Sequence, residues 1–255
     1  MIKKILLEKK VKKHARLYKF GTVKRRLQSL SISHMQSNHF DPVKSKKVTK
    51  LMTAMQKTHG PAQKSKAITK NILMDMIATA NDSVLDIRDA AILCFAWASG
   101  GRRRSEIVEA VMENLDEQAD GNFLYNISRS KTDQLGKGHV VPIKGIAASA
   151  LRAWLQVSKI KTGYIFRSLT KSHRLRGQMK TATINHIVKY RIKVAGYDPK
   201  FYTAHGLRRG FITEAGKQKC PLGDVMALSG HKSVRIAMEY YESGSVINNS
   251  ASNLM

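Results

Sequence analysis

The most informative stretch of this sequence reads Ala98-Ser99-Gly100-Gly101-Arg102-Arg103-Arg104-Ser105-Glu106-Ile107. Its two glycines interrupt a helical pattern, and a new helix is expected to open at Ser105. Backbone N–H groups and the helix dipole favour an anion at such a junction, and the three arginines add positive charge. A triple arginine by itself is usually part of a solvated loop, so the stretch needs support from the rest of the chain.

Two further stretches carry polar residues at predicted helix junctions. His205-Gly206-Leu207-Arg208 opens a helix, and the i, i+3 spacing puts His205 and Arg208 on one face. Leu228-Ser229-Gly230-His231 lies at the next junction, and Tyr240 follows nine residues after its histidine. A histidine that caps a helix and a tyrosine packed in the core would explain each feature singly. Their joint order along the chain indicates a reactive site.

The charge of the chain points to a polyanionic partner. Its 255 residues include 45 Lys+Arg and 18 Asp+Glu, which gives a net charge of +27. An enzyme for a small neutral substrate has no use for such a field, because self-repulsion destabilises the folded state. Residues 1–65 alone hold 17 Lys+Arg and only Glu8 and Asp41. Hydrophobic residues make up 42% of the chain, enough for a packed core, so nucleic acid is the expected partner.

Several other protein classes are excluded by what the sequence lacks. No apolar run reaches about 18 residues, so we expect no membrane span, and the N-terminus does not read as a signal peptide. The two cysteines, Cys94 and Cys220, form no Cys-x-x-Cys pair, which argues against a disulfide scaffold or zinc module and fits a reducing cytoplasm. The sequence contains no P-loop, no His-Glu-x-x-His and no carboxylate cluster at metal spacing, so we expect no cofactor and no metal ion.

The periodicity predicts a mostly α-helical protein with a small antiparallel β-sheet. Residues 1–65 are expected to form a basic helical domain and residues 66–255 a larger domain. Asp86 is expected to cap a strongly apolar helix, and Leu30, Met35 and Leu51 belong to candidate apolar stripes in the first domain. Two strands are expected to form a hairpin with a long polar tip. The predicted helices cover residues 23–35, 43–56, 86–98, 105–112, 146–157, 183–194, 203–215, 222–229 and 234–241, and the strands cover 123–128 and 139–143.

Taken together, these motifs resemble those of the tyrosine recombinases, the phage and bacterial integrase family. The family pattern Thr-Gly-x-Arg-x-Ser-Glu-Leu places its arginine two positions before Ser-Glu, which selects Arg103 from the three arginines. The stretches at 205–208 and 228–240 match the family's His-x-x-Arg, Leu-Gly-His and terminal tyrosine, and Ser130-Lys131-Thr132 is similar to its hairpin lysine segment. The resemblance covers about residues 67–255. It implies six catalytic residues: Arg103, Lys131, His205, Arg208, His231 and Tyr240.

The resemblance also implies a metal-free reaction at a DNA phosphodiester. Arg103 and Arg208 would hold the non-bridging oxygens with charge-assisted hydrogen bonds. Tyr240 would attack and form a 3′-phosphotyrosyl bond, which conserves the energy of the phosphodiester, so religation needs neither ATP nor a metal ion. The remaining implied roles are protonation of the departing 5′-oxygen by Lys131, help with proton transfer at the nucleophile by His205, and contact with the scissile phosphate by His231.

The expected partner is double-stranded DNA with a specific recombination site. Strand exchange through a Holliday junction implies a homotetramer on paired sites, with accessory DNA-bending proteins as further candidates. We expect a cytoplasmic, nucleoid-associated protein with no membrane partner. The basic N-terminal part resembles the later helices of the family's core-binding domain, but only about twenty residues precede it. This suggests a shortened DNA clamp or a fragment of a longer protein.

Some assignments have alternatives. Lys137 competes with Lys131, because some relatives place the lysine in a Gly-Lys-Gly turn, and only register favours Tyr240 over Tyr241. Ser229 stands where the family usually has glycine. The alternative functions are a non-catalytic DNA-binding relative that acts in plasmid maintenance and a DNA-relaxing enzyme of the type IB topoisomerase kind.

Overall fold

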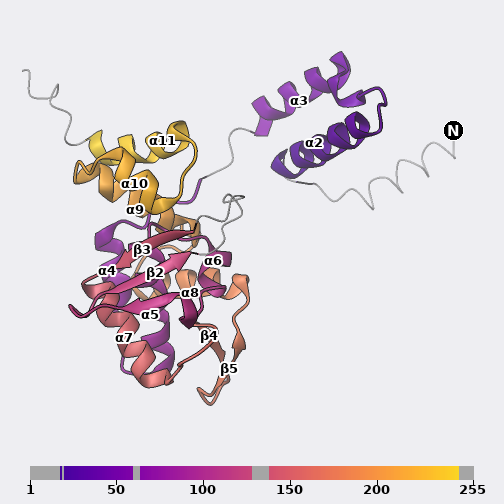
Figure 1. Cartoon of the computed structure of the whole chain (residues 1–255). Coiled ribbons are helices and arrows are strands. Elements are labelled where there is room, and N and C mark those ends of the chain that lie inside the picture. The colour runs from indigo at the N-terminus through magenta and orange to yellow at the C-terminus, as the bar shows by residue number, and fades with distance from the viewer. Residues whose placement is uncertain (1–17, 19, 60–63, 128–137, 247–255) are drawn as a thin grey trace, which may run out of the picture. The chain divides into compact units, whose positions relative to one another are not determined.

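A computed structural model of the chain describes residues 18, 20–59, 64–127 and 138–246 (Figure 1). The chain divides into two compact units, Met1–Lys64 and Ser65–Met255. Helices predominate in the described parts of both units, and the second unit also contains two small antiparallel sheets. The prediction of a mostly α-helical protein with a small antiparallel sheet is confirmed.

In its described part, the first unit contains the helices α2 (Phe20–Gln36) and α3 (Lys46–His59). A 3-10 turn at Pro42–Lys44 joins them. The Asp41 carboxylate closes this connection, because it accepts hydrogen bonds from Ser31 Oγ at 2.6 Å and from Val43 N at 2.9 Å. The turn occupies the start of the predicted second helix, so α3 begins at Lys46 rather than at residue 43.

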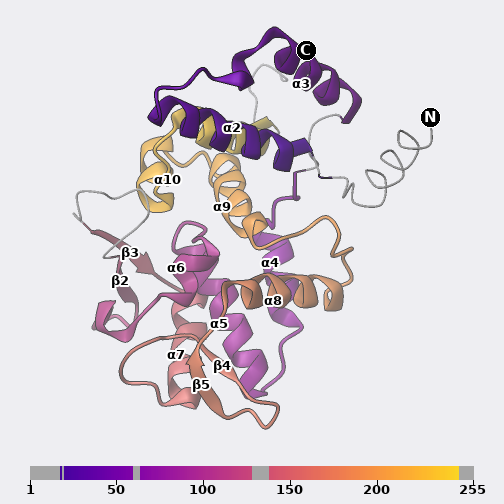
Figure 2. The same cartoon turned by 90° about the vertical axis from the view of Figure 1, so that its right-hand side faces the viewer.

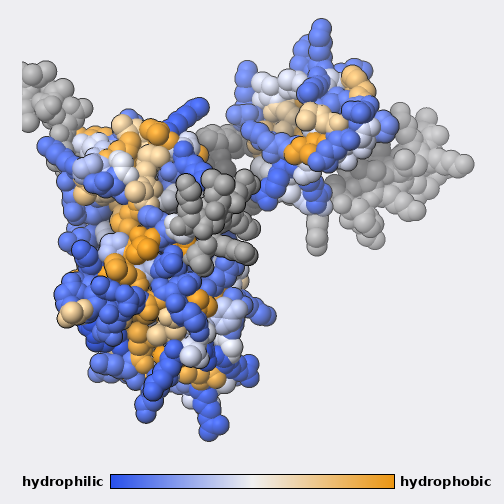
Figure 3. All heavy atoms as spheres, viewed as in Figure 1, coloured by the Kyte–Doolittle hydropathy of each residue, from blue (hydrophilic) through white to orange (hydrophobic). Residues whose placement is uncertain are grey.

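An apolar groove of about 540 Å³ lies between these helices, with Leu27 and Met52 in its lining. Figure 3 shows an apolar patch surrounded by hydrophilic residues on the visible face of this unit. Leu30, Met35 and Leu51 are 43%, 58% and 61% exposed. The apolar stripes predicted for the first unit are therefore only partly buried. Helices α2 and α3 cover only the faces that they turn toward each other.

Helix α5 (Val84–Ala98) lies at the centre of the second unit. Ser83 caps it by accepting a hydrogen bond from Asp86 N at 3.1 Å, so the prediction of Asp86 as the cap is wrong. Asp86 instead lies in the first turn and pairs with the buried Arg191 of α8 (Thr181–Val194). The carboxylate that marked the helix start in the sequence is thus engaged in an ion pair between two helices.

The core of the second unit surrounds α5. Eight residues of this helix are buried, which is more than a single amphipathic face provides. Helix α7 (Ile146–Ser158) packs along it, and the Phe95 ring meets Tyr125 and Phe166 edge-to-face at 5.2 Å and 5.4 Å between ring centroids. The apolar helix expected near residues 86–98 is therefore the central core element.

A three-stranded antiparallel sheet covers this core. Its strands are β1 (Leu115–Glu117), β2 (Phe123–Ile127) and β3 (His139–Ile143), in that order. Tyr125 pairs with Val141, so β2 and β3 form the predicted hairpin. The tip between them, residues 128–137, lies outside the described residues. Strand β1 and the pair β4 (Arg167–Leu169) and β5 (Leu175–Gln178) were not predicted from the sequence.

The remaining helices lie around this centre. Figures 1 and 2 both show α9 and α10 gathered at the end of the second unit away from α7 and the β4–β5 pair. The helix predicted over 105–112 ends at Val108, and a separate 3-10 turn covers Met112–Asn114. None of the helices in the described residues is long and apolar enough to cross a membrane. The other bounds are α4 (Lys70–Ala78), α6 (Arg104–Val108), α9 (His205–Lys217), α10 (Leu222–Ser229) and α11 (Val234–Ser245).

Candidate active site

The site is centred on the turn between α5 and α6, where two glycines allow close approach. Gly100 and Gly101 have φ angles of +92° and +73°, which L side chains rarely adopt. A Cβ on Gly100 would overlap the carbonyl of Leu228, and one on Gly101 would overlap the Cα of Arg208. The glycines thus bring together three stretches that are far apart in the sequence.

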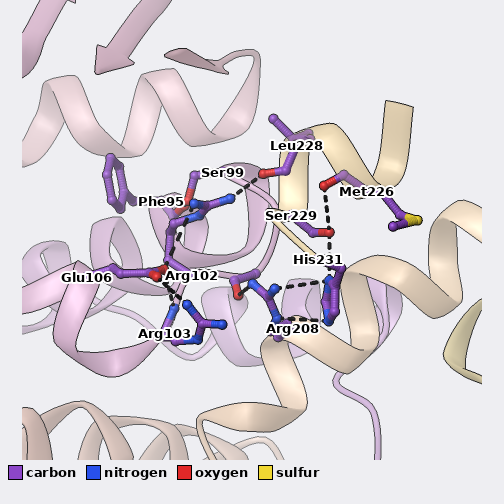
Figure 4. Close-up of polar contacts among 11 residues, drawn as sticks. Phe95, Ser99, Arg102, Arg103, Glu106, Arg208, Met226, Leu228, Ser229 and His231 are labelled. Carbon is purple, nitrogen blue, oxygen red and sulfur yellow. Dashed lines mark hydrogen bonds and ion pairs between the residues drawn. The ribbon is translucent and has the colours of Figure 1, made fainter. Parts of the chain in front are cut away.

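The first two arginines after these glycines have different surroundings (Figure 4). Arg102 is buried, and its Nη2 donates a hydrogen bond to the carbonyl of Leu228 on α10. The Arg103 side chain is 42% exposed. Glu106 accepts hydrogen bonds from Arg103 N at 2.9 Å and from Arg103 Nη1 at 3.0 Å, and it thereby orients that guanidinium. Arg102 therefore belongs to the packing of the turn, whereas Arg103 is available to a ligand.

Helix α9 contributes the next two predicted residues. His205 is its first residue, and Arg208 follows one turn later. Arg208 is only 4% exposed, and its Nη1 donates to the carbonyl of Gly101 at 3.1 Å. Burial, followed by the charges of Arg103 and Arg102, lowers the pKa of Arg208 to about 10. Arg208 is therefore still protonated at neutral pH, and its charge has little water around it.

His231 lies directly against this guanidinium. Helix α10 ends at Ser229, and its cap Gly230 has a left-handed φ of +68° that turns the chain so that His231 faces Arg208. Arg208 Nη2 lies 3.0 Å from Nδ1 of His231, and Ser229 Oγ lies 2.8 Å from the same nitrogen. Burial, followed by the charge of Arg208, lowers the pKa of His231 to about 4. His231 is therefore neutral at physiological pH.

His205 is affected in the same direction. Desolvation, followed by the charges of Arg208, Arg209 and Arg103, lowers its pKa. The neutral imidazoles of the two histidines thus lie close to the guanidinium groups of Arg103 and Arg208. An anion that entered it would relieve the repulsion among the positive charges and would favour protonation of the histidines.

These side chains line a cavity of about 700 Å³. It combines Arg103, His205, Arg208 and His231, so the structure brings together four of the six residues singled out in the sequence. Among the described residues that line the cavity there is no carboxylate, so this lining is suited to a phosphate group. The full lining is Arg102, Arg103, Arg104, Ser105, Thr181, Ala204, His205, Arg208, His231 and Ile236.

Tyr240 and Tyr241 lie on α11, which packs against α9 and contributes Ile236 to the cavity lining. The Tyr241 hydroxyl donates to the carbonyl of Cys220 at 2.6 Å. The Tyr240 ring lies 4.8 Å from the guanidinium carbon of Arg209, and its backbone carbonyl accepts from Thr213 Oγ1 at 3.2 Å. Tyr240 also contributes to the electrostatic environment of Arg208, although it is not part of the cavity lining.

The lysine candidates lie outside the described part of the chain. Lys131 and its competitor Lys137 both belong to residues 128–137. Within the described residues, no group of three or more His, Cys, Asp or Glu is arranged to hold a metal ion.

Three residues of the site were not recognised in the sequence. Arg102 and Arg209 flank predicted catalytic arginines, and nothing in their local pattern distinguishes a packed arginine from a reactive one. Ser229 was noticed in the sequence because the family usually has glycine at this position. Its contact with His231 can be seen only in the folded chain.

A model described as the phage integrase family matches residues 66–245. The chain belongs to the phage integrase family. An integrase/recombinase described as a xerD homolog, from Selenomonas ruminantium, is 34% identical over 176 residues, which cover 66% of this chain and 51% of that protein. A putative integrase/recombinase, y4rF, from Sinorhizobium fredii (strain NBRC 101917 / NGR234) is 27% identical over 158 residues, which cover 60% of this chain and 35% of its own length. The aligned region thus spans about half or less of the length of these curated relatives.

Solved structures share the fold at low sequence identity. The XerA recombinase has a TM-score of 0.59 and 17% identity, and the match covers 98% of this chain and 90% of that one. The Tn1549 transposon integrase in complex with transposon right end DNA has a TM-score of 0.64 and 12% identity, over 95% and 82% of the two chains. A lambda integrase dimer bound to a COC′ core site has a TM-score of 0.59 and 18% identity, over 88% and 60%. These similarities support the integrase fold.

Proposed function

We propose that this protein is a site-specific DNA recombinase that cleaves and rejoins DNA through a covalent 3′-phosphotyrosyl intermediate. The observation that carries the proposal is the convergence of Arg103, His205, Arg208 and His231 on one cavity, whose described lining residues include no carboxylate. Membership of the phage integrase family and relatives named integrase/recombinase support it. The net charge of +27 favours DNA as the substrate, because phosphate contacts dominate DNA affinity.

The two arginines stabilise the charge that develops on the phosphate. Arg208 is buried and bonded through Nη1 to the Gly101 carbonyl, and Arg103 is held by Glu106. Preorganised donors of this kind need no rearrangement when the non-bridging oxygens gain charge. Loss of one such donor typically lowers a rate about 10²- to 10³-fold.

The histidines act as neutral hydrogen-bond partners. With pKa values below the ordinary range, His231 can donate one ring N–H to a phosphate oxygen, and His205 can accept a proton near the attacking hydroxyl. The approach of the anionic phosphate raises both pKa values toward neutrality, which is suited to proton transfer.

We assign the nucleophile to Tyr240 rather than Tyr241. The Tyr241 hydroxyl is bonded to the carbonyl of Cys220, whereas Tyr240 lies next to Arg209 and contributes to the surroundings of Arg208. Lys131 stays the proposed donor to the 5′-oxygen, with Lys137 as its competitor. Exchange of strands between two duplexes requires two cleavages on each, so we further propose a homotetramer on paired sites.

A capture experiment with DNA of random sequence tests this proposal. The full chain is incubated with nicked duplexes whose arms are randomised, covalent complexes are isolated under denaturing conditions, and their DNA is sequenced. We expect adducts on the 3′ side of the cut and an enriched pair of inverted arms. Stable DNA binding without any adduct would instead indicate a non-catalytic DNA-binding protein. Adducts on arbitrary sequences, together with relaxation of supercoiled plasmid by a monomer, would indicate a topoisomerase.

A further inference from the structure

Ser229 is the last residue of α10 and is only 2% exposed. Its Oγ lies 2.8 Å from Nδ1 of His231 and 3.5 Å from the carbonyl of Met226 (Figure 4). The hydroxyl can donate only one hydrogen, so the much shorter contact to the imidazole is the stronger candidate for it. A serine at this place thus has a polar partner that glycine could not provide.

The protonation of the imidazole follows from its neighbours. A neutral ring carries a hydrogen on one nitrogen and accepts at the other. Arg208 has only donors: its Nη2 lies 3.0 Å from Nδ1, and its Nε is directed as a donor at Nε2 over the longer distance of 3.3 Å, a contact that an Nε2–H ring would not accept. Both nitrogens of a neutral ring cannot accept at once. Nδ1 has two close donors, Ser229 and Arg208, so Nδ1 is the acceptor and Nε2 carries the hydrogen.

We propose that Ser229 is a positioning residue that holds His231 in the Nε2–H tautomer by donating its hydroxyl hydrogen to Nδ1. The inference rests on the proposed function, in which Nε2–H donates to an oxygen of the scissile phosphate. When Arg208 directs its donors to that phosphate, Nδ1 loses one of its two partners. The serine hydroxyl then remains to fix both the tautomer and the direction of the ring.

The tautomer can be measured without DNA. The full chain is labelled with ¹⁵N-histidine, long-range ¹H–¹⁵N spectra are recorded at pH 7.5, and His231 is assigned by the loss of its signals in His231→Gln. We expect the coupling pattern of an Nε2–H ring in the wild type and a shift toward a mixture of tautomers in Ser229→Ala. An Nδ1–H pattern in the wild type would overturn the inference even if the variant failed to fold.

The rate of adduct formation at saturating captured DNA gives the second readout. Ser229→Ala should lower it about 3- to 10-fold, the effect of one hydrogen bond of typical net strength. The matched control is Ser158→Ala, because Ser158 is also a buried serine at the last position of its helix, α7, and is not among the residues that line the cavity. The control should stay within about twofold of the wild type.

The outcomes separate this inference from the proposed function. An unchanged rate and an unchanged His231 spectrum in Ser229→Ala would overturn the inference, provided that the wild type forms adducts. Absence of adducts from the wild type on every DNA in the captured pool would overturn the proposed function. A slow Ser229→Ala variant with a mixed tautomer, beside a Ser158→Ala variant of normal rate, supports both.

Discussion

The backbone of Gly101 lies directly against Arg208, so closely that a Cβ on the glycine would overlap the Arg208 Cα. Gly101 also has a φ of +73° and accepts a hydrogen bond from Arg208 Nη1. We therefore expect Gly101→Ala to lower the free energy of unfolding by about 2–5 kcal/mol, through left-handed strain and steric overlap. Urea unfolding of the full chain measures this change.

Gly223 provides the control for that substitution. It lies near the start of α10, and a Cβ there would meet nothing within 4 Å. Gly223→Ala should leave stability unchanged or raise it by up to about 1 kcal/mol, because alanine restricts the unfolded chain. Equal destabilisation by the two substitutions would contradict the close packing between the glycine turn and α9.

Arg102 and Arg103 should respond oppositely to replacement by alanine. Arg102→Ala leaves the part-buried Leu228 carbonyl without this donor and should cost about 1–3 kcal/mol of stability. Arg103→Ala removes an exposed ion pair with Glu106 and should cost less than about 1 kcal/mol, while it lowers the adduct rate about 10²- to 10³-fold. Thermal unfolding and adduct assays on both variants check this. An active Arg103→Ala protein would contradict the role of that arginine.

Stability should decrease at acidic pH because of His231. Its folded pKa is about 4, below the ordinary value near 6.5, so the unfolded chain binds the proton first. The stabilising contribution is present above about pH 6.5 and is lost as the pH falls toward 4. Burial disfavours the charged imidazole most, and the neighbouring groups Arg208, Arg103, His205 and Arg102 act in the same direction. Urea midpoints between pH 7 and 4.5 should fall more steeply for the wild type than for His231→Gln, and parallel curves would contradict this.

Tyr241→Phe should affect stability but not chemistry. The Tyr241 hydroxyl donates to the Cys220 carbonyl at 2.6 Å, and its loss should cost about 1 kcal/mol. Because the variant keeps Tyr240, we expect adduct formation within about threefold of the wild type. Denaturant unfolding and the captured DNA substrate provide the two measurements. Loss of the adduct in a folded Tyr241→Phe protein would assign the nucleophile to Tyr241.

Much of the fold was predictable where a local pattern was strong. The hairpin of β2 and β3 follows from alternation, because Phe123, Tyr125 and Ile127 are buried and the residues between them are less so. Strand β5 could not be recognised in this way, since all four of its residues are exposed and carry no apolar period. The apolar positions Leu73 and Met76 did mark α4, which the prediction nevertheless omitted.

Four of the residues selected in the sequence line one cavity, but the environments of these residues were not predictable. The resemblance to the family pattern selected Arg103 and left Arg102 as a neighbour of unknown role. The burial of Arg102 depends on Leu228, 126 residues away, and no local pattern can report that contact. The lowered pKa of His231 depends on Arg208 in the same way. Tertiary packing, rather than residue type, decides which of these charges a phosphate can reach.

The covalent bond to Tyr240 tests the central claim most directly. Wild type, Tyr240→Phe and Tyr241→Phe are incubated with the captured nicked substrate, and adducts are digested and mapped by mass spectrometry. We predict a DNA-linked peptide that carries the phosphate on Tyr240, the same adduct from Tyr241→Phe, and none from Tyr240→Phe, which should still bind DNA. An adduct formed by Tyr240→Phe, or its absence from the wild type, would contradict the account.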